Sequence, residues 1–162
     1  MKKIGIFLSF FFIFSIFLIG ETKNNIVFKE DFEGADKIPG SWVLNLSDPS
    51  RTKIQIDSST SHSGKMSLLI ENTGFSSSNL CLSKISLKIG RIYRLRGWIK
   101  TNGVYSDPES RYPTSLPACL SMLSFPFTNH SPTVGGNSDW TKVETLFIAT
   151  KSKDCVKVNL GM

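Results

Sequence analysis

Turn-forming residues interrupt the chain at short intervals from residue 21 onward, and this spacing limits the secondary structure that it can form. Gly, Pro, Ser, Asn and Asp recur every several residues, and no amphipathic helical repeat survives between them. Short strands fit such intervals, whereas helices of ordinary length do not. Strands are predicted at residues 26–32, 41–46, 53–57, 65–71, 79–87, 91–101, 118–125, 141–149 and 155–160. A set of short strands like this predicts an all-β antiparallel sandwich or barrel.

The clearest strand is residues 91–101, where two kinds of side chain alternate. One face carries the apolar residues Tyr93, Leu95 and Ile99. The opposite face carries Arg94, Arg96 and Trp98. Because successive side chains of a strand point to opposite faces, the first set can enter a core while the second faces away from it. Residues 85–89 also alternate, and Gly90 follows them, so the two segments are predicted to form an antiparallel hairpin.

The N-terminus has the layout of an export signal. Lys2 and Lys3 precede an uncharged apolar run at residues 4–19. The run falls between a typical signal core and the roughly 20 residues of a membrane-spanning helix. Cleavage near Gly20 and a retained N-terminal anchor therefore both stay open. We predict a hydrophobic signal helix at residues 1–20 and an exported protein that is secreted, surface-held or in the cell envelope. Any membrane contact is expected only through an uncleaved N-terminus.

Composition argues against several function classes. The formal charge is +6, but Lys and Arg are scattered, so nucleic acid is not an expected partner. His62 and His130 lie far apart, which leaves little material for a zinc site or a His-based triad. No GxSxG, HExxH or phosphate-binding glycine loop is present. We therefore predict that this chain is not an enzyme.

The three cysteines leave several redox states open. Cys81, Cys119 and Cys155 form no CxxC motif that would indicate a metal or redox site. Export permits a disulfide, yet the sequence does not choose among the three possible single pairs. Three buried free thiols are the alternative.

An acidic cluster, Glu30, Asp31 and Glu33, is the remaining chemical candidate. A glycosidase needs two carboxyl groups flanking one bond, normally from different strands, so a local cluster is the wrong arrangement. Alternation places Asp31 and Glu33 on one side of a strand, which suits a hard cation or a turn. A structural calcium and plain solvated charge are the two interpretations.

Four segments occur in the order seen in jelly-roll carbohydrate-binding modules. They are EDFEGADKIPGSW (residues 30–42), SHSGKMSLLI (61–70), GRIYRLRGWIKT (90–101) and DWTKVETLFIA (139–149). Over residues 26–160 the chain resembles the families of such modules numbered four, nine and twenty-two, which share a galactose-binding-like sandwich. The resemblance implies a jelly-roll antiparallel β-sandwich at residues 26–162 that binds carbohydrate without transforming it.

The resemblance also implies a metal site and an incomplete end. In such modules a structural calcium is often held by the Glu of the first motif, by backbone oxygens near a Ser-Gly-Lys turn, and by an Asp in the final strand. These roles carry over to Glu33 and to the backbone of Ser63 and Lys65. The final Asp has no counterpart, because the family's closing strand normally follows a segment like CVKVNLGM (residues 155–162).

We therefore expect a sandwich that lacks its closing C-terminal strand. One explanation is truncation, with a glycoside hydrolase domain encoded downstream that would carry any catalysis. The other is a module that lacks one strand and exposes a sheet edge, which natural sheets normally avoid.

Sugar binding requires an aromatic face for the apolar side of a sugar ring and polar groups for its hydroxyls. Trp98 beside Arg94 and Arg96 supplies both kinds of group. Tyr105 and Tyr112, in the proline-containing loop 102–117, are candidates for a second aromatic wall, since long loops are often functional. The alternative is that Trp98 packs under a loop, that the arginines are solvated, and that the tyrosines only pack their loop.

Two further tryptophans border predicted strands next to turn residues, and we assign Trp42 and Trp140 to the core. The expected partner is a polysaccharide or a cell-surface glycan. The second hypothesis is an extracellular adhesion or protein–protein interaction domain with no sugar ligand, because one fold supports many partners.

Overall fold

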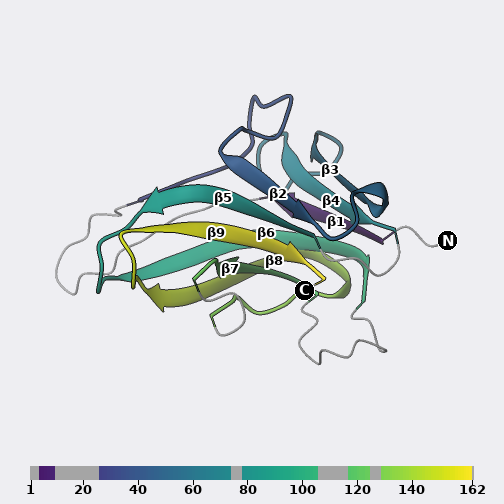
Figure 1. The fold of residues 1–162 in the computed structure, drawn as a ribbon. Coiled ribbons are helices and arrows are strands. Elements are labelled where there is room, and N and C mark those ends of the chain that lie inside the picture. The colour runs from purple at the N-terminus through teal and green to yellow at the C-terminus, as the bar shows by residue number, and fades with distance from the viewer. Residues whose placement is uncertain (1–3, 10–25, 74–77, 106–116, 125–128, 162) are drawn as a thin grey trace.

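The computed structural model describes residues 4–9, 26–73, 78–105, 117–124 and 129–161, which are coloured in Figure 1. In these residues the regular structure is β-strand, apart from one short 3₁₀ helix at Pro49–Arg51. The strands are β1 (Ile4–Ser9), β2 (Trp42–Leu46), β3 (Thr52–Asp57), β4 (Ser67–Asn72), β5 (Ser78–Ser86), β6 (Ile92–Val104), β7 (Ala118–Met122), β8 (Gly136–Ile148) and β9 (Lys153–Leu160). The described residues contain no helix that is long and apolar enough to cross a membrane.

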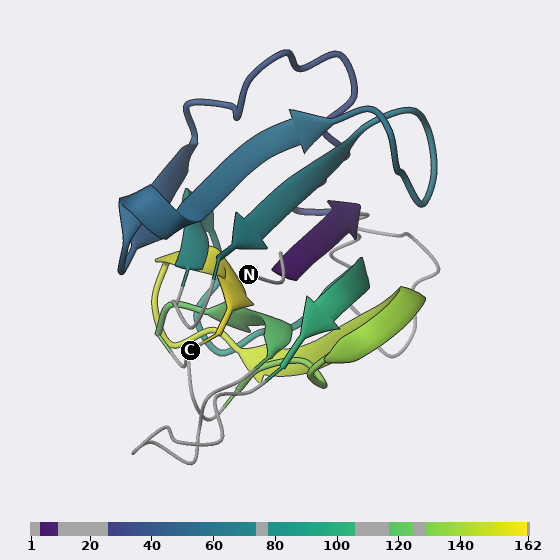
Figure 2. The same ribbon diagram turned by 90° about the vertical axis from the view of Figure 1, so that its right-hand side faces the viewer.

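The strands form two sheets in which every neighbouring pair is antiparallel. One sheet has five strands in the order β3-β4-β1-β6-β8, seen along one side of the molecule in Figure 2, and the other has the order β2-β5-β9-β7. The predicted all-β antiparallel class is confirmed. The jelly-roll form and the missing closing strand stay predictions.

The predicted hairpin around Gly90 is wrong. β5 and β6 belong to different sheets, so the chain crosses between the sheets after Ser86. Gly90 has a φ of 78°, a left-handed conformation that glycine adopts without steric cost. Its N–H donates to the carbonyl oxygen of Ala149, at 2.8 Å. Apolar and polar residues alternate in residues 85–89 and 91–101 because each segment places one face against the same core. The two segments do not pair with each other.

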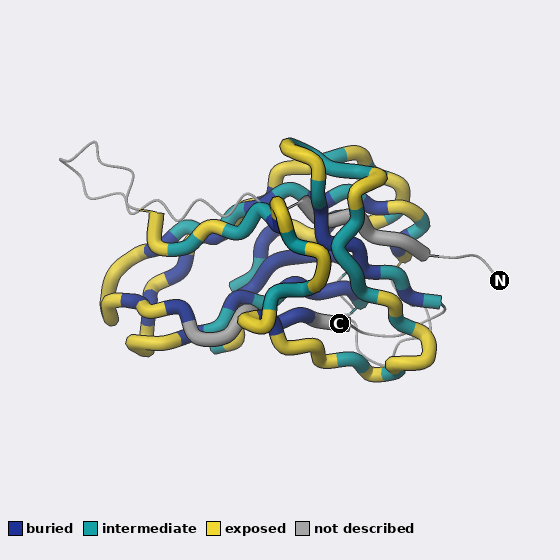
Figure 3. The backbone as a smooth tube through the Cα atoms, turned by 90° about the horizontal axis from the view of Figure 1, so that it is seen from above, coloured by how far each residue is buried: buried dark blue, intermediate teal, exposed yellow. Residues whose placement is uncertain are grey.

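The core takes side chains from both sheets. Its fully buried members include Leu68, Ile70, Leu80, Leu95, Ile99, Leu120, Val156 and Val158. Figure 3 shows these buried stretches running through the centre of the molecule, with exposed residues in the peripheral loops. The alternation predicted for 91–101 is confirmed, because buried and half-buried residues alternate along β6.

The segment before β2 is not the strand that was predicted at residues 26–32. Phe32 has a φ of 59°, a left-handed conformation that is incompatible with a continuous strand. Glu30 holds this turn through both carboxylate oxygens. Oε1 accepts from the Phe32 N–H at 3.1 Å, and Oε2 accepts from Trp42 Nε1 at 3.3 Å. The Phe32 side chain is buried in the core, as is Trp42, whose predicted core position is confirmed.

The predicted signal helix is not confirmed at its start. Residues Ile4–Ser9 form the strand β1, while residues 10–25, the rest of the apolar run and the predicted cleavage point, lie outside the described residues. An extended backbone satisfies its N–H and C=O groups through neighbouring strands instead of within itself. β1 finds such neighbours in β4 and β6.

Candidate functional site

The face of β6 turned away from the core carries the predicted basic and aromatic row. Arg94, Arg96 and Trp98 are all half-buried, between the fully buried residues of the core face. The strand register places Arg96 opposite Glu144 of β8 and Trp98 opposite Lys142. The predicted arrangement of these three residues on one sheet face is therefore confirmed, whereas their role stays a prediction.

An aromatic cluster forms around Trp98, and we define it as His62, Trp98 and Trp140. His62 lies in the loop between β3 and β4, and its ring stacks on Trp98 with centroids 3.9 Å apart and planes 16° apart. Trp140 of β8 meets the same imidazole edge-on, at 5.9 Å and 77°. Such geometries are favourable for aromatic pairs. The cluster joins a loop and two strands on the outer face of the five-stranded sheet.

The core assignment of Trp140 is wrong. Trp140 is half-buried and does not belong to the core cluster. Its position has the same parity as Lys142 and Glu144, which are exposed, while Val143 is buried. Counting alternate positions back from Val143 is the sequence signal that indicates an outward Trp140.

Charged groups of both signs flank the aromatic cluster. Lys100 Nζ donates to Asp139 Oδ1 at 3.0 Å, and Lys142 Nζ lies 3.2 Å from Glu144 Oε2. The hydrogen bond from Lys100, followed by one from the Trp140 backbone N–H, lowers the pKa of Asp139 below its ordinary value. Asp139 therefore stays ionised through the neutral range. These ammonium and carboxylate groups can donate to and accept from the hydroxyls of a ligand.

The loop over Trp98 bears on the alternative interpretation of that residue. His62 covers one face of the indole, so Trp98 does pack under a loop on that side. The imidazole Nδ1 is buried and has no hydrogen-bond partner among the described residues. His62 was missed because nothing in the local sequence indicates that a turn residue reaches a strand so far along the chain.

The tyrosine candidates do not join the cluster in the described residues. Tyr105 is 63% exposed just beyond the end of β6. Six strand residues lie between Trp98 and Tyr105, and seven steps of 3.3 Å along a regular strand span about 23 Å. Tyr112 lies outside the described residues. Arg94 lies opposite Leu146 instead of beside the cluster, which leaves Arg96 as the nearer of the two arginines.

Glu33 lies where the resemblance placed it, beside the Ser63–Lys65 turn, but its contacts are with donors. Oε1 accepts from the backbone N–H groups of Lys65 and Met66, at 2.8 and 2.9 Å. Calcium is held by oxygen ligands, whereas these N–H groups already compensate the carboxylate. In the described part of the chain no three His, Cys, Asp or Glu residues gather as a metal site. Glu33 Oε1 does not fit a calcium ligand in this arrangement, and calcium binding stays a prediction.

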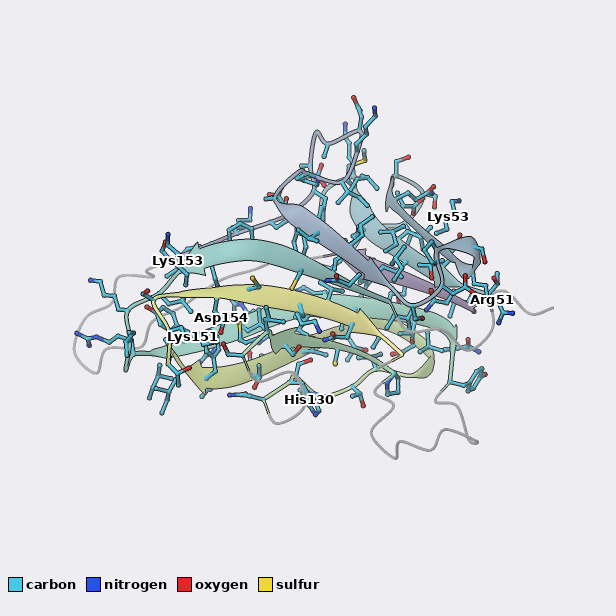
Figure 4. All side chains as sticks on the ribbon, viewed as in Figure 1. Arg51, Lys53, His130, Lys151, Lys153 and Asp154 are labelled. Atoms are coloured by element: carbon cyan, nitrogen blue, oxygen red, sulfur yellow. The ribbon has the colours of Figure 1, made fainter. Side chains whose placement is uncertain are left out.

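Basic residues elsewhere are dispersed. Arg51 and Lys53 lie at one end of the molecule in Figure 4, and Lys151 and Lys153 lie at the other. Arg51 pairs with Asp48, with 3.2 Å between Nε and Oδ2, and Lys53 lies 3.7 Å from Glu71 Oε2. These side chains are partly exposed, and such surface pairs contribute little to stability.

The cysteines are all free, and two of them are neighbours. Cys81 on β5 lies close enough to Cys155 on the adjacent β9 for the two thiols to interact, while Cys119 lies on β7, across β9 from β5. Burial, with a smaller contribution from Cys155, raises the pKa of Cys81 to about 11. Burial likewise raises the pKa of Cys119 to about 11.

Native-state alkylation is expected to discriminate among these thiols. A raised pKa lowers the fraction of reactive thiolate, so Cys81 and Cys119 should react with iodoacetamide at pH 8 roughly a hundredfold more slowly than unfolded thiols. The half-buried Cys155 should be modified first. Peptide mass mapping of timed samples measures the order, and the same reaction in denaturant is the control. Modification of Cys119 before Cys155 would contradict the described packing.

No known protein family, curated protein or solved structure matches this chain. What is established is the fold class, an all-β protein with two antiparallel sheets.

Proposed function

We propose that this protein binds carbohydrate without transforming it, and that the aromatic cluster is the contact surface. The observation that carries the proposal is the cluster of His62, Trp98 and Trp140 with the Lys100–Asp139 ion pair next to it. The apolar face of a sugar ring packs on aromatic rings, and its hydroxyls hydrogen-bond to charged groups. The ligand proposed is a polysaccharide or a cell-surface glycan.

The contact surface is composite. Because His62 occupies one face of the Trp98 indole, the sugar is assigned to the remaining surface of Trp98 and to Trp140. Lys142 lies directly opposite Trp98 and Arg96 lies two positions along β6, and both supply donors. The jelly-roll, galactose-binding-like sandwich and the exported location belong to the same proposal. A glycan outside the cell is a target that an exported, non-catalytic domain can reach.

Affinity electrophoresis tests the proposal in gels that contain soluble polysaccharides. The wild-type chain is expected to be retarded by at least one of them. Trp98→Ala and Trp140→Ala should each lower the affinity by roughly threefold to tenfold, the value of one aromatic contact. Tyr105→Ala, which removes an exposed ring outside the cluster, is the matched control and should leave the mobility unchanged. Thermal melting of each variant checks its fold.

Two results count against carbohydrate binding at this surface. One is mobility that no polysaccharide changes. The other is retardation that is the same for wild type, Trp98→Ala and Trp140→Ala.

A second candidate function, protein–protein adhesion without a sugar ligand, has an observation of its own. Ile92, Leu146 and Ile148 are each more than half exposed, and they line a pocket of about 410 Å³. β8 is an edge strand of its sheet. Exposed apolar patches and open strand edges are features of protein contact surfaces. Binding to a protein partner that survives competition by free saccharide, and that Leu146→Ser abolishes, would favour this function.

A further inference from the structure

The centre of the five-stranded sheet is occupied by part of the segment that the sequence predicts to be an export signal, either cleaved near Gly20 or retained as an anchor. β1 lies between β4 and β6, as the purple strand in Figure 2 shows. It pairs with β4 from Ile4 opposite Asn72 to Leu8 opposite Leu68. The six residues that are predicted to begin an export signal therefore form a strand of the folded domain.

The directions of the neighbouring strands make this position hard to close without a strand. β1 is antiparallel to β4 and also antiparallel to β6, so β4 and β6 run parallel to each other. In Figure 2 their arrows point the same way and that of β1 points the opposite way. Without β1 the two edges are about 9.5 Å apart, which is two strand spacings. Both would expose unpaired N–H and C=O groups inside the sheet.

The register selects a segment with apolar residues at alternate positions. Position 6 lies opposite Ile70 and Thr101, which are 0% and 3% exposed. Position 8 lies opposite Leu68 and Ile99, both 0% exposed. The chain has Ile6 and Leu8 at these two positions. A shift of one residue would exchange the two faces of the strand and move Ile6 and Leu8 away from these buried partners.

We propose that the space between β4 and β6 is a strand-binding site and that Ile4–Ser9 is its occupant. The segment stays bound to the domain when the chain is cut near Gly20. Its binding mode is strand addition, in which main-chain hydrogen bonds to both neighbours give affinity and alternate apolar positions give specificity. This inference concerns the completeness of the fold and stands apart from carbohydrate binding at the aromatic cluster.

A cut in the full chain tests the proposal. A protease recognition sequence is inserted after Gly20, and the folded protein is cleaved and passed over a size-exclusion column. The N-terminal fragment is expected to co-elute with the remainder in a one-to-one ratio. Amides of Ile70 and Ile99 should keep their protection from hydrogen exchange. Mass spectrometry of the eluted peak measures both quantities.

Two variants at one position provide the control. Phe7→Pro removes a backbone N–H from the middle of a central strand, which sheets do not tolerate, and should release the fragment after cleavage. Phe7→Ala keeps the N–H and should retain it. Separation of the wild-type fragment from the remainder overturns the proposal. Release of the fragment counts against the proposal whatever happens to the remainder. The remainder could keep its melting temperature, unfold, or form a dimer in which a second copy protects the β4 amides.

A cross-link in the uncut chain gives a second readout that does not depend on the cleaved protein staying soluble. With the native cysteines replaced by alanine, Phe7→Cys and Leu69→Cys occupy opposite register positions and should form a disulfide under mild oxidation. Phe7→Cys with Leu68→Cys is offset by one residue, so the two positions lie on opposite faces and should not cross-link. Equal yields from the two pairs would overturn the assigned register.

Discussion

Replacing Phe32 with alanine is expected to lower the free energy of unfolding by about 3–5 kcal/mol. The ring is 1% exposed within the core cluster, and its centroid lies 5.9 Å from that of Trp42. Truncation removes this burial and leaves a cavity that the surrounding strands fill only in part. Alanine and phenylalanine bear a similar cost for the left-handed φ of 59°, so the change isolates the contribution of the ring. A loss of this size is a large fraction of the stability of a typical domain.

Urea denaturation followed by circular dichroism measures the effect. The matched control is Tyr105→Ala, which removes an aromatic ring that is 63% exposed and should change the stability by less than about 0.5 kcal/mol. Equal losses from the two variants would show that the segment before β2 does not pack into the core.

Replacing Gly64 with alanine is expected to lower the free energy of unfolding by about 2–3 kcal/mol, from a conformational cost and weakened hydrogen bonds. Gly64 has a φ of 73°, which costs a residue with a side chain about 1 kcal/mol. An added Cβ would also collide with the Glu33 carboxylate. Moving that carboxylate disturbs its hydrogen bonds from the Lys65 and Met66 N–H groups, and bonds to a charged group contribute roughly 1.5–3 kcal/mol each. The Glu33 carboxylate is exposed and can move aside, so only part of this hydrogen-bond contribution is lost.

Gly34 provides a matched control for Gly64. Its φ is 72°, but apart from its two chain neighbours no described residue has an atom within 4 Å of the position that a Cβ would take. Gly34→Ala should therefore cost only the conformational term of about 1 kcal/mol. In the double variant of Glu33→Ala with Gly64→Ala the collision is absent, so its loss should be smaller than the sum of the two single losses. A Gly64→Ala loss no larger than that of Gly34→Ala would contradict the Glu33 contact.

Most strands from β2 onward could be predicted from local sequence, whereas β1 and the absence of a strand at residues 26–32 could not. Alternation along 91–101 correctly separated Tyr93, Leu95 and Ile99 from Arg94, Arg96 and Trp98, because a strand with one buried face leaves a period of two in its sequence. The nearness of Glu33 to the turn at Ser63–Lys65 was predicted by resemblance. The kind of group that Glu33 contacts was not predicted. The resemblance implied backbone carbonyl oxygens, whereas the structure has backbone N–H donors.

Long-range arrangement was the part that could not be predicted. The residues that neighbour His62 in the sequence do not indicate that this loop residue stacks on Trp98 of β6. The partners of β5 and β6 were assigned wrongly, because two alternating neighbours can face one core from different sheets. The apolar run at 4–19 has the composition of a signal, and composition does not show that Ile4–Ser9 also matches the register between β4 and β6.

The three tryptophan indole N–H signals in a ¹H–¹⁵N spectrum test the central claim most directly. Trp98 and Trp140 belong to the aromatic cluster, while Trp42 is buried and donates its Nε1–H to Glu30, which makes it an internal control. Labelled protein is titrated with soluble oligosaccharides from a polysaccharide that retards it in the gel. Carbohydrate binding at the cluster predicts saturable shifts of the Trp98 and Trp140 signals with the Trp42 signal unmoved. Saturable shifts elsewhere in the spectrum, with the Trp98 and Trp140 signals unchanged, would contradict it.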